Sequence, residues 1–331
     1  MVNILISGYY GFDNIGDESI LRTLVSSLRE HIPDCSLTVL SHNPASTREK
    51  YGVEAVDRMS PMAILRAVKK CDMLISGGGS LLQDVTSSKS LHYYLSIIRC
   101  AEFFHKKVFI YSQGIGPIDR PGNRRAAAAA LKRADGIVVR DERSAALLEE
   151  IGIARDKVVI TADPVIRMKK PDGDVGAEIL RKAGVSLDGR LTVGWAIRER
   201  DTDSRFVKEL LRSIQMMKDK YNAQSVLIPF HYEEDGEVCR HIAAQLPDDT
   251  AVCLNEKYLS EDMLSIIGNM DLLVGVRLHS LIYAAIMGVP LIGISYDPKC
   301  TAFLNSVGLD KLSPKENVTA ERFRAEADRV L

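Results

Sequence analysis

Short runs of β-branched and other apolar residues alternate with amphipathic segments along the whole chain. Such a run is typical of a buried strand, whereas apolar residues three or four positions apart indicate a helix that covers it. In the first half, the runs predict strands at residues 2–7, 37–41, 73–76, 108–112, 136–140 and 158–161. Helices are expected between them, for example over residues 18–32 and 124–134. This alternation is typical of parallel sheets with helices on both faces.

A polar, turn-rich stretch at residues 166–190, which includes Pro171 and Gly173, interrupts the alternation and suits a linker. Strands resume at residues 191–197, 225–229, 251–254, 272–276 and 291–295, and residues 319–331 have a helical pattern. We therefore expect an amino-terminal Rossmann-like domain at residues 1–165, a linker at 166–190 and a second Rossmann-like domain at 191–331. Both domains should be doubly wound α/β domains that face each other across a cleft.

Composition narrows the classes of partner. The chain has 331 residues, of which 46% are hydrophobic, and a net charge of -1, so no overall field attracts nucleic acid. Its six cysteines are scattered without the spacing of a zinc site, which favours reduced thiols and no bound metal. The sequence shows neither a signal-peptide pattern nor an apolar stretch of membrane-spanning length. A cytoplasmic protein is expected.

Three glycine-rich turns follow predicted strands of the first half. The first, residues 8–18, ends in Asp13, Asn14, Asp17 and Glu18 before a helix, and it lacks the lysine of a P-loop. Its polar residues suit either a capped helix or a ligand site. The first turn therefore argues against NAD binding and P-loop binding of ATP.

The second turn runs from Ser76 to Asp84, and the third from Ser112 to Pro117. Backbone N–H groups in such turns bind anions or sugar hydroxyls. Because the carboxyl ends of parallel strands share one edge of a sheet, three such turns favour a pocket there. The residues that we expect to line it in these two turns are Gly78, Gly79, Ser80, Gln83, Asp84 and Gln113.

The second half places basic residues at strand ends instead. Arg277 and His279 follow the most apolar strand, Arg198 follows another, and Lys299 lies after a third. Three cations at one edge suit a small anion that carries both phosphate and carboxylate groups. An imidazole beside them can donate or accept a proton near neutral pH. We expect chemistry at this edge, although a buried histidine that merely holds the turn would fit the same residues.

Several motifs together resemble the polysaccharide pyruvyl transferase family, and most closely its CsaB-type members, which decorate secondary cell wall polymers of bacteria. The motifs are Gly11-Phe-Asp-Asn-Ile-Gly-Asp-Glu18, Gly77-Gly-Gly-Ser-Leu-Leu-Gln-Asp84, Gln113-Gly-Ile-Gly-Pro117, Arg277-Leu-His-Ser280 and Tyr296-Asp-Pro-Lys299. The resemblance implies a GT-B-like architecture and transfer of pyruvate from phosphoenolpyruvate to a sugar as a ketal. The implied acceptor is N-acetylmannosamine in a lipid-linked disaccharide at the inner membrane face, ketalised at its 4- and 6-hydroxyls, in a polymer that anchors S-layer proteins.

Under this interpretation the second domain binds the donor and the first binds the acceptor. His279 would protonate C3 of phosphoenolpyruvate, while Arg277 and Lys299 neutralise its charge, with no metal and no cofactor. Asp17, Glu18 or Asp84 would take protons from the acceptor hydroxyls. The donor-binding residues would be Arg277, Lys299, Arg198, Ser280 and Tyr296, and the acceptor-binding residues Asp13, Asn14 and those of the second and third turns.

Two other functions fit the same pattern. A GT-B glycosyltransferase or epimerase would use a nucleotide sugar and should bind UDP or GDP. A non-catalytic sugar-binding protein would bind a disaccharide and release no phosphate from phosphoenolpyruvate.

Overall fold

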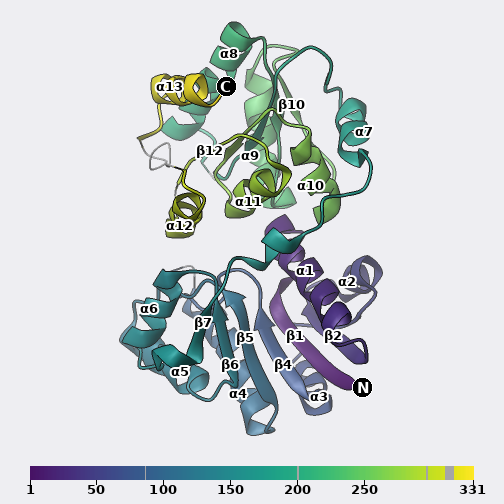
Figure 1. Cartoon of the computed structure of the whole chain (residues 1–331), viewed down its shortest axis with the longest axis vertical. Coiled ribbons are helices and arrows are strands. Elements are labelled where there is room, and N and C mark those ends of the chain that lie inside the picture. The colour runs from purple at the N-terminus through teal and green to yellow at the C-terminus, as the bar shows by residue number, and fades with distance from the viewer. Residues whose placement is uncertain (86, 200, 296, 310–316) are drawn as a thin grey trace. The chain divides into compact units, whose positions relative to one another are not determined.

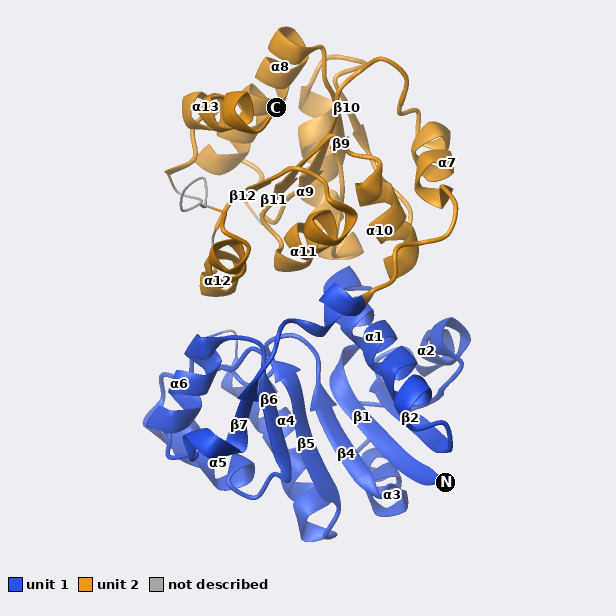
Figure 2. Ribbon diagram, viewed as in Figure 1, with its two compact units in different colours: residues 1–167 blue, residues 168–331 orange. Residues whose placement is uncertain are grey.

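The structure is a computed structural model that describes residues 1–85, 87–199, 201–295, 297–309 and 317–331 (Figure 1). It divides into two compact units, Met1–Arg167 and Met168–Leu331, which Figure 2 shows in blue and orange. Each unit has a parallel sheet and helices of its own, as the α/β alternation predicts.

Unit 1 is built on a parallel sheet whose described strands follow the order β3-β2-β1-β4-β5-β6-β7. β1 pairs with β2 on one side and with β4 on the other, so that Ile4 lies opposite both Leu37 and Met73. Because the chain order reverses between β1 and β4, the carboxyl ends of these two strands are where an open α/β sheet leaves room for a ligand. The strands are β1 (Val2–Tyr10), β2 (Cys35–Ser41), β3 (Glu54–Asp57), β4 (Met73–Gly77), β5 (Lys107–Gln113), β6 (Gly136–Val139) and β7 (Val158–Ile160).

Helices connect these strands and lie on both faces of the sheet (Figure 1). Parallel crossovers are right-handed, so α1 and α2 cover one face and α3, α4 and α5 cover the other. α4 contacts α3 on one side and α5 on the other, which makes these three helices a continuous layer. The helices are α1 (Ile15–His31), α2 (Pro44–Tyr51), α3 (Pro61–Lys70), α4 (Ser88–Phe103), α5 (Pro121–Leu131) and α6 (Glu142–Glu150), with short 3-10 turns η1 (Arg155–Lys157) and η2 (Pro164–Arg167).

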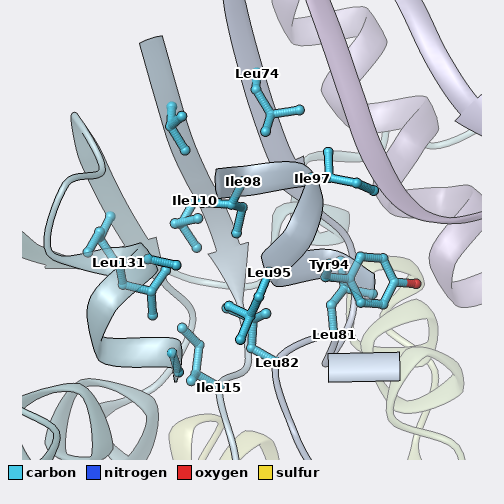
Figure 3. Close-up of a cluster of buried hydrophobic side chains, with 14 of the residues drawn as sticks. Leu74, Leu81, Leu82, Tyr94, Leu95, Ile97, Ile98, Ile110, Ile115 and Leu131 are labelled. Atoms are coloured by element: carbon cyan, nitrogen blue, oxygen red, sulfur yellow. The ribbon is translucent and has the colours of Figure 1, made fainter. Parts of the chain in front are cut away.

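Neighbouring residues of β1 belong to different hydrophobic cores. Ile4 and Ile6 pack in one cluster with Leu24 of α1, whereas Leu5 packs in a second cluster with Leu95 of α4. Figure 3 shows part of the second cluster, where side chains from α4 meet those from β4 and β5. The two-residue period of a strand thus fixes which side chains face each helical layer.

Unit 2 is built on a smaller parallel sheet, whose described strands follow the order β10-β9-β8-β11-β12. Its order reverses between β8 and β11, again leaving room for a ligand at their carboxyl ends. The strands are β8 (Thr192–Ala196), β9 (Gln224–Leu227), β10 (Ala251–Cys253), β11 (Leu272–Gly275) and β12 (Leu291–Gly293). The helices are α7 (Val175–Lys182), α8 (Arg205–Tyr221), α9 (Tyr232–Gln245), α10 (Ser260–Gly268), α11 (Leu278–Met287), α12 (Pro298–Ser306) and α13 (Ala320–Val330).

The structure differs from the expected linker at residues 166–190. Residues Val175–Lys182 form helix α7 of unit 2, and the N–H of Gly176 donates to Ser265 Oγ of α10 at 2.9 Å. A side chain at position 176 would collide with the backbone of Ser265, so the two helices meet at closest approach. The polar residues before α7 obscure its helical pattern in the sequence. The division between the two units falls between Arg167 and Met168.

All eleven strands predicted from sequence are present with shifted ends, and the structure adds the short edge strand β3. β3 escaped the pattern because Glu54 and Asp57, at its two ends, are charged. Within the described residues, every helix is too short or too polar to cross a membrane.

Candidate active site

The first glycine turn joins β1 to α1. Gly11 has a φ of +80°, in the left-handed region, and a side chain there would collide with Ser41 Oγ, so glycine is required. Asn14 caps α1, because its side-chain oxygen accepts from the Gly16 N–H at 3.1 Å. Asp13 forms an ion pair with Lys50 of α2 at 3.1 Å. Both side chains therefore shape the turn.

Glu18 is buried beneath this turn. Its carboxylate accepts from the Gly11 N–H at 2.8 Å and from the Tyr51 hydroxyl. Burial raises the pKa of Glu18, against the opposing effect of these two hydrogen bonds. With 6% of its surface exposed, Glu18 ties the turn to α2 and is poorly placed to take a proton from a substrate. The structure thus argues against the predicted catalytic role of Glu18.

Asp17 lies on the other side of the same turn and is half-buried. It faces the second glycine turn, because a Cβ added at Gly79 would lie 2.5 Å from Asp17 Oδ1. A Cβ added at Gly78 would lie 2.9 Å from the hydroxyl of Tyr10, which donates to Gly77 O at 2.8 Å. Burial, followed by the charge of Asp17, raises the pKa of Tyr10 well above its usual range. The glycines therefore let the second turn approach Asp17 closely.

Asp84, predicted to bind the acceptor or to act as a base, is engaged in hydrogen bonds within unit 1. Its carboxylate accepts from the N–H groups of Asp119 and Arg120 at 2.9 and 3.0 Å, and from the Asn123 side chain at 2.8 Å. Although burial alone raises its pKa, these hydrogen bonds outweigh burial and lower the pKa. Asp84 therefore holds the segment that leads into α5 and offers little to a substrate.

Gln113 connects the second and third turns. Its Nε2 donates to Ser76 O at 2.8 Å and to Ser76 Oγ at 3.0 Å, while the N–H of Gly114 donates to Gly79 O at 3.1 Å. The Gln113 side chain is fully buried, and its Oε1 has no hydrogen-bond partner within the described part of the chain. Gln83 is half-buried in the second turn. The carboxyl ends of β4 and β5 are thus tied together.

A buried ion pair closes this edge of unit 1. Arg140, after β6, donates to Asp163 Oδ2 at 2.7 Å and to Ser80 Oγ at 3.0 Å. The side chains of Arg140 and Asp163 are only 4% and 9% exposed. Ser80 thereby joins this pair to the second glycine turn. The edge runs continuously from Asp17 through the glycines to Arg140.

Aromatic rings lie beside the first turn. The rings of Tyr9 and Phe12 stack at 4.0 Å, and Phe12 stacks on His42 at 4.4 Å. Arg58 is buried behind them, with its guanidinium 5.1 Å from the Phe12 ring, and donates to Gly8 O at 2.8 Å. The half-buried Phe12 therefore has a fixed orientation.

The carboxyl edge of unit 2 centres on Arg277. Its Nε and Nη2 donate to the two carboxylate oxygens of Asp235 at 3.0 and 2.5 Å, which fixes the plane of the guanidinium. Asp235 is 1% exposed and also accepts from the N–H of His231, the residue that caps α9. Glu234 lies 3.8 Å from Arg277 Nη2. The cation is thus held by two acids of the first turn of α9.

His279 lies in the first turn of α11, two residues after Arg277, and is half-buried. Ser280 is fully buried, and its hydroxyl donates to Arg277 O at 2.6 Å. This bond tightens the start of α11 and uses the Ser280 hydroxyl within the protein, contrary to its predicted role in donor binding. Arg277 and His279 remain close neighbours at the edge.

The other predicted donor residues lie on nearby segments. Lys299, in the first turn of α12, is 3.5 Å from Asp297 Oδ2 and is partly exposed. Arg198 follows the central strand β8 and is half-buried. Tyr296 lies outside the described residues. Arg277, Arg198 and Lys299 thus follow β11, β8 and β12, which are adjacent strands of the sheet.

A family model for polysaccharide pyruvyl transferases matches residues 14–298, which include every predicted site residue except Asp13 and Lys299. The chain belongs to the polysaccharide pyruvyl transferase family. It is also 21% identical over 369 residues to the amylovoran biosynthesis protein AmsJ of Erwinia amylovora, covering 94% of this chain and 88% of that protein. The chain is therefore a pyruvyltransferase that acts in polysaccharide synthesis.

Solved structures show the same fold at low identity. The UDP-GlcNAc 2-epimerase of Methanocaldococcus jannaschii has a TM-score of 0.70 and 13% identity, over 100% of this chain and 92% of that one. The ADP-heptose lps heptosyltransferase II of E. coli has a TM-score of 0.57 and 15% identity, over 100% and 98%. Both are GT-B proteins, so the pyruvyltransferase has the predicted GT-B-like fold.

Sequence reasoning missed two features of this pyruvyltransferase. Asp235 is one of three acidic residues in the first turn of α9, where the helix dipole makes acids common, so no local pattern identifies it as the partner of Arg277. The second feature is the buried ion pair of Arg140 and Asp163. Its hydrogen bond to Ser80 depends on residues 60 positions apart, which no local pattern shows.

Proposed function

We propose that this pyruvyltransferase uses phosphoenolpyruvate as donor and forms a cyclic ketal on a sugar of a lipid-linked polysaccharide precursor. The observation that carries the proposal is the fixed guanidinium of Arg277 beside His279, at the edge of unit 2 where the strand order reverses. Family membership supports the transfer of pyruvate, and this edge supports an anionic donor.

The donor is an anion with a carboxylate and a phosphate on one three-carbon unit. Asp235 engages Nε and Nη2 of Arg277, so a donor oxygen would bind at Nη1. Arg198 and Lys299, on adjacent segments, would bind the remaining charges. Arg277 and Lys299 each have an acid nearby, which would hold the two cations in place before the donor binds.

The reaction needs an acid and then a base. A proton from His279 would add to C3 of phosphoenolpyruvate, leaving C2 electron-poor and open to attack by a sugar hydroxyl. The C2–O bond to phosphate then breaks as a second hydroxyl of the same sugar attacks C2, which closes the ketal. The two hydroxyls together lose two protons, one balancing the proton gained at C3 and one leaving with phosphate.

Unit 1 would bind the acceptor. The close approach of Gly78 and Gly79 to Asp17 would place backbone and carboxylate groups where sugar hydroxyls could bind. Of the three acids predicted as bases, Glu18 and Asp84 are buried, whereas Asp17 is half-buried and faces Gly79 of the second turn. We assign the base to Asp17.

The acceptor that we propose is N-acetylmannosamine, ketalised at its 4- and 6-hydroxyls, in a secondary cell wall polymer precursor that later anchors S-layer proteins. This choice rests on the likeness of the five sequence motifs to CsaB-type enzymes. The test is to incubate the enzyme with phosphoenolpyruvate and a synthetic N-acetylmannosaminyl-N-acetylglucosamine lipid analogue. Phosphate release with a product heavier by one pyruvate less one water supports the proposal, whereas no release with this acceptor refutes the choice of sugar.

A nucleotide-sugar reaction is the second candidate, because the Neisseria meningitidis 2-epimerase, solved with UDP-GlcNAc bound, shares the fold at a TM-score of 0.65 and 12% identity over 99% of this chain and 91% of that one. Thermal unfolding separates the candidates. Protection by phosphoenolpyruvate but not by UDP or GDP supports the pyruvyl donor, and protection by a nucleotide alone favours the second candidate.

A further inference from the structure

The outer surface of the layer formed by α3, α4 and α5 is strongly basic. Within these helices and the two residues after α5, all of which the structure describes, no exposed position is acidic. The exposed cations there are Arg66, Lys69, Lys70, Lys89, Arg99, Arg125, Lys132 and Arg133. Since the whole chain has a net charge of -1, the remainder is negative on balance, and the charge is concentrated on one face.

The pattern on α4 shows how this face is built. Its exposed positions are Lys89, His92, Ser96, Arg99 and Phe103, spaced by three or four residues, so they form one stripe along the helix. The opposite stripe, which includes Leu91 and Leu95, is buried in the core. Figure 3 shows Leu95, Ile97 and Ile98 of α4 turned into this core.

Contacts between the helices make the surface continuous. Lys69 at the end of α3 lies 5.1 Å from the ring of Phe104, which follows α4. Burial raises the pKa of Glu102 on α4, and the charges of Arg133 and Arg99 oppose that rise. Exposed acids border the layer at Asp72, Asp119 and Asp135, of which Asp72 accepts from the N–H of Asn3 and Asp135 is paired with Lys107 at 2.7 Å. The cations of three helices therefore act as one patch.

Apolar side chains project from the same patch. Phe103 is 75% exposed at the end of α4, and Met62 is 58% exposed at the start of α3. Exposed apolar groups among lysines and arginines are typical of surfaces that lie in the headgroup region of an anionic bilayer. A soluble polyanion would use the cations but would give no reason for the exposed phenyl ring.

We infer that the outer face of α3, α4 and α5, called here the basic layer, docks unit 1 side-on to a membrane of anionic phospholipid. The inference deepens the proposed function, because a lipid-linked acceptor would be presented at the same membrane. α4 and α5 begin next to the second and third glycine turns, so the basic layer borders the edge proposed to bind that acceptor. Docking would keep this edge near the lipid headgroups.

The test is co-sedimentation of the full chain with vesicles. Wild-type protein should bind vesicles of phosphatidylcholine with about a third phosphatidylglycerol, bind pure phosphatidylcholine weakly, and dissociate as salt is raised. The variant R66E/R99E/R125E, with one reversal on each helix, should lose about 100-fold or more in vesicle affinity at an unchanged melting temperature. F103S should cause a smaller loss.

A matched control carries three reversals of exposed cations in unit 2, R181E/K182E/K208E. The control should bind vesicles as the wild type does, and both triple variants should retain phosphate release with a water-soluble acceptor. Equal loss in the control, equal binding to both vesicle types, or binding only to a short DNA duplex would overturn the inference. Vesicle binding is measured without substrates, so the assay can be interpreted even if the proposed reaction is not observed.

Discussion

The two sheet edges where ligands are expected differ in chemistry although both follow the same topological rule. In unit 1 the edge combines glycines, the half-buried carboxylate of Asp17 and hydrogen-bonded neutral groups, and its arginine Arg140 is buried and paired with Asp163. In unit 2 the edge presents Arg277, Lys299 and His279, of which Arg277 is held in one orientation by Asp235.

This difference is consistent with the proposal that unit 1 binds the acceptor and unit 2 binds the donor. Close backbone approach and a carboxylate suit hydroxyl groups of a sugar, whereas oriented cations beside an imidazole suit a phosphorylated acid. Two units with the same doubly wound fold would thus provide two kinds of site, because different side chains follow their strands. If this proposal holds, substitutions at one edge should leave binding at the other edge unchanged.

The largest effect should come from H279A. Without the proposed general acid, phosphate release from phosphoenolpyruvate should fall about 1000-fold or more, while the affinity for phosphoenolpyruvate changes little. Steady-state phosphate assays and calorimetric titration measure the two quantities. H241A, which removes a histidine from the last turns of α9, is the matched control and should keep full activity. Activity of H279A within tenfold of the wild type would remove His279 from the mechanism.

D17N should act on the other edge. Loss of the proposed base should lower kcat about 100-fold, leave donor affinity unchanged and leave the melting temperature close to that of the wild type. D13N is the control, since Asp13 shares the turn but is paired with Lys50. If D13N and D17N lower kcat equally, the carboxylate of Asp17 has no special role.

D235N should show how far donor binding depends on the orientation of Arg277 rather than on its charge. Arg277 remains, but it loses one of the two acceptors that fix its plane, so KM for the donor should rise about tenfold with kcat within a few-fold of the wild type. In the background of R277A, the same change should add little. A fully additive double variant would show that Asp235 acts independently of Arg277.

D84N should lower the stability of the protein but not kcat, which is the opposite of the result expected for D17N. Weakening the hydrogen bonds to Asp119, Arg120 and Asn123 should destabilise unit 1 by about 2 kcal/mol and lower its Tm by about 4–8 °C. The kcat measured well below the melting point should stay near that of the wild type. Because the folded-state pKa of Asp84 is lowered, its stabilising effect should persist above the unfolded pKa and disappear as the pH falls through the folded value.

E18Q should change the stability of the protein least among these variants, and the change should depend on pH. Burial raises the pKa of Glu18, so its favourable contribution is complete below the unfolded pKa and is lost as the pH rises through the folded value. Melting curves from pH 4 to pH 7 should therefore show E18Q gaining stability relative to the wild type as the pH increases. A constant difference across this range would contradict the raised pKa.

Much of the fold was predictable from sequence because apolar periodicity decides it. Ile4, Leu5 and Ile6 alternate between two cores, as their pattern indicates. Helix α7 was hidden by the polar residues before it, since the contact of Gly176 with Ser265 joins segments 89 residues apart.

The candidate site was predictable only in part, because contacts between residues far apart in the sequence decide it. Glycine turns and strand-end cations are visible locally, but the commitment of Asp84 to α5 and of Asp235 to Arg277 depends on distant contacts. The same carboxylate can cap a helix or face a substrate, and only its neighbours in space decide which.

The most direct test of the division of labour is calorimetric titration of phosphoenolpyruvate into the wild type, R277A and D17N. The account predicts that R277A loses at least about tenfold in donor affinity, because a fixed guanidinium contributes on the order of 1.5–3 kcal/mol to an anion, while D17N binds as the wild type does. Unchanged donor affinity in R277A together with a large loss in D17N would contradict it.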